Sequence, residues 1–313
     1  MVPDIEIQNL SVCFDTAQGP VYAVRDLSTT FRGGRIAGVI GESGSGKSVM
    51  GMSLLRLLPN TARVTGKCFF GQEELYSMPL RQLRKLRGAA IGLIPQNPNA
   101  SLDPVMKLGR QLTEAITTHG RRNRREANRQ AADLLRRFGF EDPERILGQY
   151  PFQMSGGMNQ RLVSALGLAC RPGWVIADEP TKGLDAVIRN QVYSVLRQIY
   201  TEYHSSMIVI THDLSLARRL CDDIRVLYMG QIIEQGTAEE VMDRPRHPYT
   251  AGLIHALPSR GMVPIPPPDP RRLEHTGCPF YPRCREAGER CGREKPGDYP
   301  LPEGRKVRCF LYA

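Results

Sequence analysis

The chain has 313 residues, of which 41% are hydrophobic and 24% are charged, and its formal net charge is +10. These proportions are typical of a soluble globular protein, and no stretch approaches the roughly 18 apolar residues of a membrane span. The first residues lack the basic region and apolar core of a signal peptide, so we expect a cytosolic protein.

A β-rich stretch to about residue 31 precedes a phosphate-binding motif. Residues 36–40 (IAGVI) are uniformly apolar and predict a buried strand, and residues 41–48 (GESGSGKS) match the pattern G-x-x-x-x-G-K-[ST]. Residues 49–58 predict a helix that Pro59 ends. The glycines let backbone N–H groups point at phosphate oxygens, and the helix N-terminus adds partial positive charge there. We name residues 41–48 the P-loop and predict that it binds a nucleotide.

The P-loop residues have distinct expected roles. Lys47 is expected to reach the β- and γ-phosphates, and Ser48 is expected to ligate Mg²⁺. The alternative, a glycine-rich strand-to-helix turn without a ligand, is disfavoured because both flanks have the required pattern. The predicted contacts of this segment with the nucleotide are Gly41, Ser43, Gly44, Ser45, Gly46, Lys47, Ser48 and Val49.

The rest of the chain alternates between predicted strands and helices, which is typical of an α/β fold with a parallel sheet. Residues 107–148 are expected to be mostly helical, with Pro143 starting the last of these helices. A basic run at residues 119–126 has no interleaved aromatic residue for bases to stack on, so we predict a solvated helix face and no nucleic-acid partner. The predicted strands cover residues 64–70, 90–94, 174–178, 206–211, 224–229 and 231–235, and the predicted helices cover residues 187–203, 214–221 and 238–242.

A second glycine-rich segment, at residues 154–161 (MSGGMNQR), precedes an apolar helical stretch at residues 162–170. Ser155 with Gly156 and Gly157 at a helix start forms another anion-binding nest. One nucleotide does not need two such nests in one chain, so we expect this nest to serve a nucleotide held by a second subunit. A capped helix with a flexible entry is the alternative.

An apolar strand that ends in two acidic residues lies at residues 174–179 (WVIADE). Asp178 is expected to hold Mg²⁺ through water, and Glu179 to polarise the attacking water as a general base. Pro180 ends the strand, which suits a loop that carries catalytic groups.

With these motifs the chain resembles the ATP-binding cassette (ABC) ATPases. At matching positions Gln96 corresponds to the Q-loop glutamine, Asp185 to the D-loop and His212 to the switch histidine. The resemblance implies that Gln96 contributes to the Mg²⁺ site and to catalysis, that His212 contacts the γ-phosphate, and that an aromatic residue stacks on adenine. Tyr22 is our candidate for that aromatic residue, and Phe14 is the alternative.

The resemblance also implies a site divided between two chains. Ser155, Gly156, Gly157 and Asp185 are then expected to contact ATP bound by the partner subunit. The catalytic residues implied are Lys47, Gln96, Glu179 and His212, so we predict an active, Mg²⁺-dependent ATPase.

The C-terminal end resembles that of ATP-binding subunits in the dipeptide, oligopeptide and nickel importer family. Residues 246–253 (RHPYTAGL), a proline-rich linker at residues 264–270 and four cysteines carry this resemblance. It implies two membrane permease subunits, an extracytoplasmic solute-binding protein and a second ATPase subunit, either a paralogue or an identical chain. The location implied is peripheral, at the cytoplasmic face of the plasma membrane.

The four C-terminal cysteines are Cys278, Cys284, Cys291 and Cys309. A cytosolic chain disfavours disulfides, and these spacings are wider than those of most zinc sites. The resemblance implies a [4Fe–4S] cluster here, with Zn²⁺ as the alternative and four free thiols as the second alternative.

The predicted fold class is therefore α/β, a P-loop NTPase of the ABC cassette type with an N-terminal β subdomain, a helical subdomain and a small Cys-rich C-terminal extension. The expected domains are a cassette over residues 1–257, with its helical subdomain at about residues 97–170, and an extension over residues 258–313. Two alternatives are an importer for another solute with a zinc-containing tail and an ABC ATPase outside transport.

Overall fold

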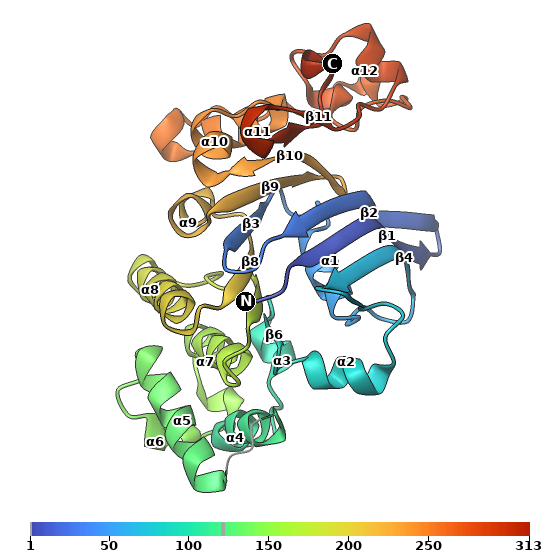
Figure 1. Cartoon of the computed structure of the whole chain (residues 1–313). Helices are drawn as coiled ribbons and strands as arrows, with labels where there is room; N and C mark the ends of the chain where they lie inside the picture. The colour runs from blue at the N-terminus through green and yellow to red at the C-terminus, as the bar shows by residue number, and fades with distance from the viewer. Residues whose placement is uncertain (1, 120–122) are drawn as a thin grey trace. The chain divides into compact units, whose positions relative to one another are not determined.

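The structure is a computed structural model that describes residues 2–119 and 123–313. The chain forms two compact units (Figure 1). Unit 1 comprises the N-terminal residues up to Ile5 together with Phe31–Ile36 and Phe69–Ile210, and unit 2 comprises Glu6–Thr30, Ala37–Cys68 and Thr211–Ala313. The chain thus passes more than once from one unit to the other, and the boundary predicted between residues 257 and 258 stays a prediction.

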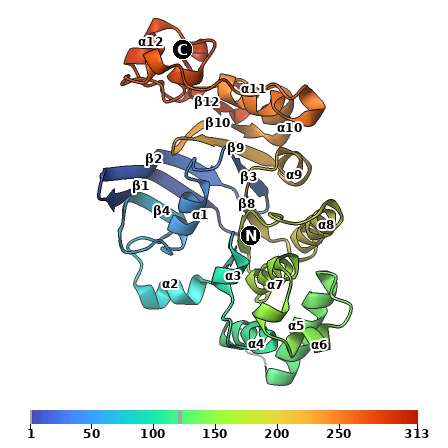
Figure 2. The same ribbon diagram turned by 180° about the vertical axis from the view of Figure 1, so that it is seen from behind.

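Unit 2 contains most of two sheets. In one, β1 lies between β2 and β4. In the other, β9 pairs in parallel with β3 and antiparallel with β10, which β12 and β11 then extend. α10 packs on β10, β9 and α9 (Figure 2). The main elements of unit 2 are β1 (Ile5–Thr16), β2 (Gly19–Phe31), β3 (Ile36–Ile40), α1 (Lys47–Leu54), β4 (Ala62–Phe70), α9 (Leu214–Leu220), β9 (Asp223–Tyr228), β10 (Gln231–Thr237), α10 (Ala238–Asp243) and α11 (Pro248–His255).

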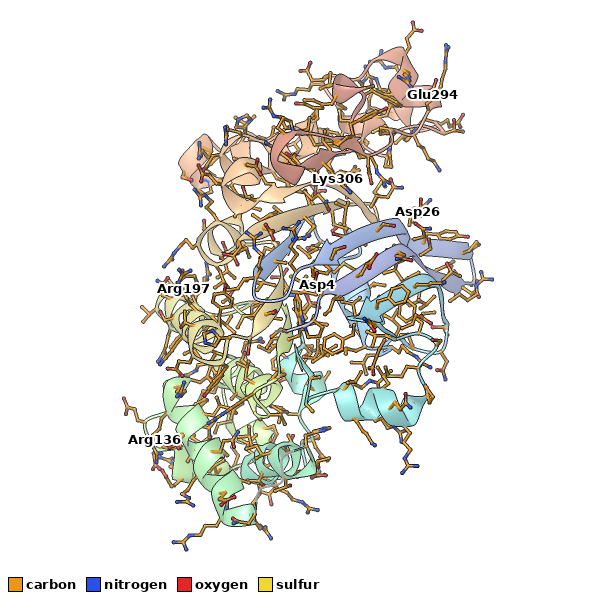
Figure 3. All side chains as sticks on the ribbon, in the orientation of Figure 1. Asp4, Asp26, Arg136, Arg197, Glu294 and Lys306 are labelled. Carbon is orange, nitrogen blue, oxygen red and sulfur yellow. The ribbon has the colours of Figure 1, made fainter. Side chains whose placement is uncertain are left out.

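The C-terminal residues of unit 2 form short elements joined by loops. They are η2 (Pro258–Arg260), η3 (Pro270–Arg272), η4 (Tyr281–Arg283), α12 (Glu289–Arg293), β11 (Tyr299–Pro300), η5 (Pro302–Gly304), β12 (Lys306–Val307) and η6 (Phe310–Tyr312). Figure 3 shows Glu294 just after α12 and Lys306 on β12.

Unit 1 is built on the parallel strands β6, β7 and β8, in which Ile91 pairs with Trp174 and Trp174 with Ser206. Every residue of β7 and of β8 is buried, as expected for strands covered on both faces. The elements of unit 1 are β5 (Glu73–Glu74), α2 (Leu80–Leu86), β6 (Ile91–Ile94), α3 (Pro98–Ser101), α4 (Leu108–His119), α5 (Arg124–Arg137), α6 (Pro143–Leu147), η1 (Pro151–Gln153), α7 (Gly156–Leu168), β7 (Trp174–Asp178), α8 (Ala186–Tyr203) and β8 (Ser206–Thr211).

Helices α4, α5, α6 and α7 pack on one another to form a helical group within unit 1 (Figure 1). α5 begins with a capping box between Asn123 and Glu126. Arg136, on the outer face of α5 (Figure 3), reaches Asp133 at 2.8 Å and Glu144 at 2.6 Å, which links α5 to α6. Within the described ranges no helix is both long and apolar enough to cross a bilayer.

Two predicted elements need correction. The helix after the P-loop begins at Lys47 and ends at Leu54, not at residue 58, because Arg56 adopts a left-handed φ of 51° ahead of Pro59. The sheet is not wholly parallel, since β9 and β10 form a hairpin through Met229 and Gly230. The basic run leads into α5 at Arg124, and Arg124 and Arg125 are exposed there, in agreement with the predicted solvated helix face; its residues 120–122 lie outside the described part of the chain.

Candidate nucleotide-binding site

The P-loop connects β3 to α1 in unit 2 by a turn that requires glycine. Gly46 has a φ of +99°, and a Cβ there would lie 2.1 Å from the Ala23 carbonyl oxygen. A Cβ on Gly41 would lie 2.2 Å from the Leu227 carbonyl oxygen. The backbone is thus packed too tightly for any side chain at either position, which fixes the loop against β2 and β9.

Lys47 opens α1 and is only 7% exposed. Its ammonium donates to the carbonyl oxygens of Gly41 at 2.9 Å and Glu42 at 2.8 Å, and to Ser45 Oγ at 3.4 Å. Ser43 and Gly44 lie exposed at the tip of the loop. A cation, a helix N-terminus and exposed loop backbone in one place make a site suited to phosphate.

In unit 1 the predicted Mg²⁺ ligand and general base follow one another at the end of β7. Asp178 is 4% exposed and Glu179 is 5% exposed. Glu179 has a φ of +50°, a left-handed conformation that costs a non-glycine residue about 1–3 kcal/mol. Its N–H donates to the Ile210 carbonyl at 2.8 Å, and its carbonyl accepts from Lys182 N–H at 3.1 Å. Neighbouring backbone therefore holds Glu179 in this conformation.

The glycine-rich nest and the D-loop lie together in unit 1. Ser155 is the N-cap of α7, and its hydroxyl accepts from the Met158 N–H at 3.3 Å. Asp185 is the N-cap of α8 and accepts from Val187 and Ile188 N–H groups at 2.9 Å each. A Cβ on Gly157 would lie 3.3 Å from Leu184, whereas Gly156 has open space around its Cα. The nest therefore has backbone free of steric cover beside the D-loop.

Three further predicted site residues lie on loops or edges. Gln96 is exposed in the bend after β6, in unit 1. His212 is exposed after β8, in unit 2, and Asp213 then caps α9. Tyr22 on β2 is 46% exposed, with the Arg25 guanidinium 5.2 Å from its ring centroid, while Phe14 on β1 is half-buried. The choice between Tyr22 and Phe14 stays a prediction.

The four C-terminal cysteines gain no support as the predicted metal centre, which stays a prediction. All four are half-buried, and Cys278 N–H donates to the Cys291 carbonyl at 2.8 Å. Burial raises the pKa of the Cys278 and Cys284 thiols to about 11 each, and repulsion from the other C-terminal thiolates adds to this rise. Among residues 2–119 and 123–313, no group of three or more His, Cys, Asp or Glu side chains is arranged to hold a metal ion.

Three P-loop contacts come from residues that no sequence motif had marked as part of the site. The Glu42 N–H donates to Tyr249 Oη at 2.9 Å, and Arg283 donates to both carboxylate oxygens of Glu42, at 2.8 and 3.1 Å. Tyr249 stands in the RHPYTAGL segment and Arg283 just before Cys284, but neither position predicts contact with a loop some two hundred residues earlier.

Known proteins match the whole chain. The ABC transporter family matches residues 24–182, and the C-terminal region of oligopeptide/dipeptide transporters matches residues 233–291. The oligopeptide transport ATP-binding protein OppD of Haemophilus influenzae is 39% identical over 319 residues, which span 100% of this chain and 98% of that protein. The dipeptide transport ATP-binding protein DppD of Escherichia coli is 37% identical over 97% of this chain and 95% of that protein.

Solved structures agree on the fold. The dimeric, post-hydrolysis state of the ATP-binding cassette MJ0796 bound to ADP and Pi superposes with a TM-score of 0.68 at 24% sequence identity. The superposition covers 75% of this chain and 98% of the MJ0796 chain. The predicted α/β cassette fold is thereby confirmed, while the predicted Cys-rich extension gains no support from the likeness.

Proposed function

Because the chain belongs to the ABC transporter family and to its oligopeptide and dipeptide group, we propose that it is the ATP-hydrolysing subunit that powers peptide uptake through a membrane importer. The observation that carries this proposal is one continuous likeness to OppD over the whole chain, P-loop and C-terminal region included. Peptide is the proposed solute class, since the relatives named above transport oligopeptides or dipeptides and none points to nickel.

The residues of the site fit ATP and Mg²⁺ by their chemistry. Lys47 and the P-loop N–H groups suit the β- and γ-phosphates. Ser48, Gln96 and Asp178 supply the hydroxyl, amide and carboxylate oxygens that Mg²⁺ prefers. When bound, Mg²⁺ neutralises charge that develops on the phosphates.

The chemical step is assigned to a few side chains. Glu179 accepts a proton from the attacking water, and the backbone bonds that fix its conformation keep its carboxylate oriented. His212 donates to the γ-phosphate oxygen. Ser155, Gly156, Gly157 and Asp185 contact the nucleotide held by a second ATPase subunit, so closure of the pair depends on the γ-phosphate.

The partners follow from the same assignment. The second ATPase subunit is proposed to be a paralogue of this chain, the two permease subunits to dock at the cytoplasmic face of the membrane, and a solute-binding protein to deliver peptide from outside. ATP then biases the ATPase pair between an open and a closed state, and this change drives the permease subunits.

The Glu179→Gln variant tests the general base. It should still bind ATP, while turnover falls by about 10²- to 10⁴-fold because the amide cannot accept the proton. Glu239→Gln, at an exposed position on α10, is the matched control and should hydrolyse ATP normally. Steady-state phosphate release by the assembled importer measures both. Full turnover by Glu179→Gln would show that another group is the base.

A metal at the cysteines is a narrower proposal that the side-chain arrangement does not favour, and no step above depends on it. Anaerobic purification followed by assays of iron, acid-labile sulfide and zinc tests it. About four irons and four sulfides per chain, lost in Cys284→Ser, would establish a [4Fe–4S] cluster. One zinc without iron would establish a zinc module, and no metal would leave four free thiols.

A further inference from the structure

The C-terminal region of unit 2 is fastened to the P-loop through Glu42. The Glu42 N–H donates to Tyr249 Oη at 2.9 Å, and the Arg283 guanidinium grips both carboxylate oxygens at 2.8 and 3.1 Å. Two parallel charge-assisted bonds fix the orientation of the guanidinium relative to the carboxylate as well as the distance between them. The Arg283 side chain is 18% exposed and that of Glu42 is 39% exposed, so the pair is partly shielded from water.

The two side chains that hold Glu42 are themselves fixed. Tyr249 is fully buried, and its ring lies 4.5 Å from the ring of Tyr228 and 5.5 Å from that of Phe280, centroid to centroid. Phe280 is 3% exposed and stands three residues before Arg283. Arg283 also donates from Nε to the Pro266 carbonyl at 3.0 Å. Packing therefore fixes the positions of Arg283, which donates to Glu42, and of Tyr249 Oη, which accepts from it.

The peptide groups on either side of Glu42 are bonded in turn to the catalytic lysine. While the Glu42 N–H points to Tyr249, the Glu42 carbonyl accepts from Lys47 Nζ at 2.8 Å and from Ser45 N–H at 3.2 Å. A rotation of this backbone would move the carbonyl and with it the ammonium group. The position of Lys47 thus depends on contacts made by Tyr249 and Arg283.

We propose that Tyr249 and Arg283 are positioning residues for ATP binding, which fix the backbone of Glu42 so that Lys47 is oriented for the phosphates. The inference rests on the proposed function and deepens it, because it makes the C-terminal region a determinant of the affinity of the P-loop for ATP. Neither side chain touches the nucleotide in this assignment.

The test compares equilibrium binding of a fluorescent ATP analogue by full-length chains in the Glu179→Gln background, with KM and kcat measured in the Glu179 form. Arg283→Gln should weaken nucleotide binding by about tenfold and raise KM similarly, while kcat changes by less than about twofold. Tyr249→Phe, which keeps the ring and removes the hydroxyl, should act in the same direction by about threefold to tenfold. Arg283→Lys should restore part of the affinity.

Two controls separate positioning from general stability. Arg218→Gln removes an exposed ion pair with Asp243 elsewhere in unit 2 and should leave nucleotide affinity unchanged. In the Glu42→Gln background, Arg283→Gln should have no further effect, because its partner is already gone.

Unchanged affinity in Arg283→Gln, or an equal effect of Arg283→Gln with and without Glu42, would overturn the inference. If Arg283→Gln does not fold, Tyr249→Phe and Arg283→Lys decide, since both keep the packing. Failure of the parent chain itself to bind and hydrolyse ATP would instead contradict the proposed function, so the two failures are distinguishable.

Discussion

Burial decides the charge state of His247. This histidine is 2% exposed, and its Nδ1 accepts from the Tyr249 backbone N–H at 3.0 Å while the backbone N–H of His247 donates to Glu234 at 2.9 Å. Burial lowers the pKa of His247 to about 3, so the ring is neutral in the folded chain at pH 7.

The free energy of unfolding should therefore fall as the pH falls. The ordinary pKa of a histidine in the unfolded chain is about 6.5, so between pH 6.5 and 3 the unfolded chain binds a proton that the folded chain does not. The loss should be about 1.4 kcal/mol per pH unit, or about 2 kcal/mol at pH 5. Urea unfolding at pH 7.5 and 5.0 measures it, with His247→Asn as the non-titrating comparison. Equal pH slopes in the two proteins would contradict the expectation.

The left-handed backbone of Glu179 gives a second expectation at the residue scale. Glu179→Gly and Glu179→Ala both remove the carboxylate, but only glycine adopts a φ of +50° without steric cost. The glycine variant should be more stable than the alanine variant by about 1 kcal/mol, measured by chemical unfolding without nucleotide. Equal stabilities would mean that the strain at this position is relieved elsewhere.

At the scale of elements, Ser155 combines a structural task with the proposed contact across subunits. Its hydroxyl caps α7, and loss of such a cap costs about 1 kcal/mol. Ser155→Ala should lower both stability and ATPase activity. Ser155→Asp should keep the cap and the stability but repel the phosphates of the partner's nucleotide. Activity should therefore fall without a loss of stability. Unfolding curves and phosphate release by the assembled importer measure the two effects, and normal activity in Ser155→Asp would limit Ser155 to capping.

The elements that could be predicted from sequence are those with a local signal. Strands β3, β7 and β8 have the predicted bounds because short, uniformly apolar runs between turn residues leave little choice. Pro143 starts α6 as expected. The end of α1 was wrong by four residues because the backbone turns at Arg56 before Pro59, and no side-chain pattern marks that turn.

In the candidate site, too, local motifs could be predicted from the sequence and contacts between distant segments could not. Motif spacing predicted site roles for Lys47, Ser155 and Glu179, and these roles stay predictions. The structure places Lys47 at the start of α1, Ser155 at the N-cap of α7 and Glu179 directly after β7. The contact between Glu42 and Arg283 spans 241 residues, and nothing in either segment encodes the other. The cluster prediction rested on the family resemblance of the four-cysteine segment, and spacing alone does not fix the directions of the thiols.

At the scale of the whole molecule, the residues after 257 help to hold unit 2 together. Arg305 lies 2.5 Å from Glu234, and these side chains are 5% and 0% exposed. Phe280 covers Tyr228 and Tyr249. Removing this region would leave the Glu234 carboxylate without its ion-pair partner, with only the backbone N–H groups of Arg246 and His247 as donors, and would uncover the aromatic rings.

A chain that ends at residue 257 should accordingly be less stable than the full chain. We expect a loss of at least about 3 kcal/mol in the free energy of unfolding, the usual cost of a buried charge that has lost its partner. Arg305→Leu in the full-length chain removes only the ion pair with Glu234, so it measures the contribution of that pair separately from that of the other residues after 257. Equal urea midpoints for the truncated and full chains would contradict the expectation and would favour residues 258–313 as an independent extension.

The separation of 241 positions between Glu42 and Arg283 also sets an interval of time during synthesis of the chain. At about 5–20 residues per second, a ribosome takes roughly 10–50 s to travel from one codon to the other. During that interval the nascent P-loop exists without the arginine that holds it. The bonds between Arg283 and Glu42 can form only after the cysteine-rich segment has emerged, so a truncated translation product lacks them.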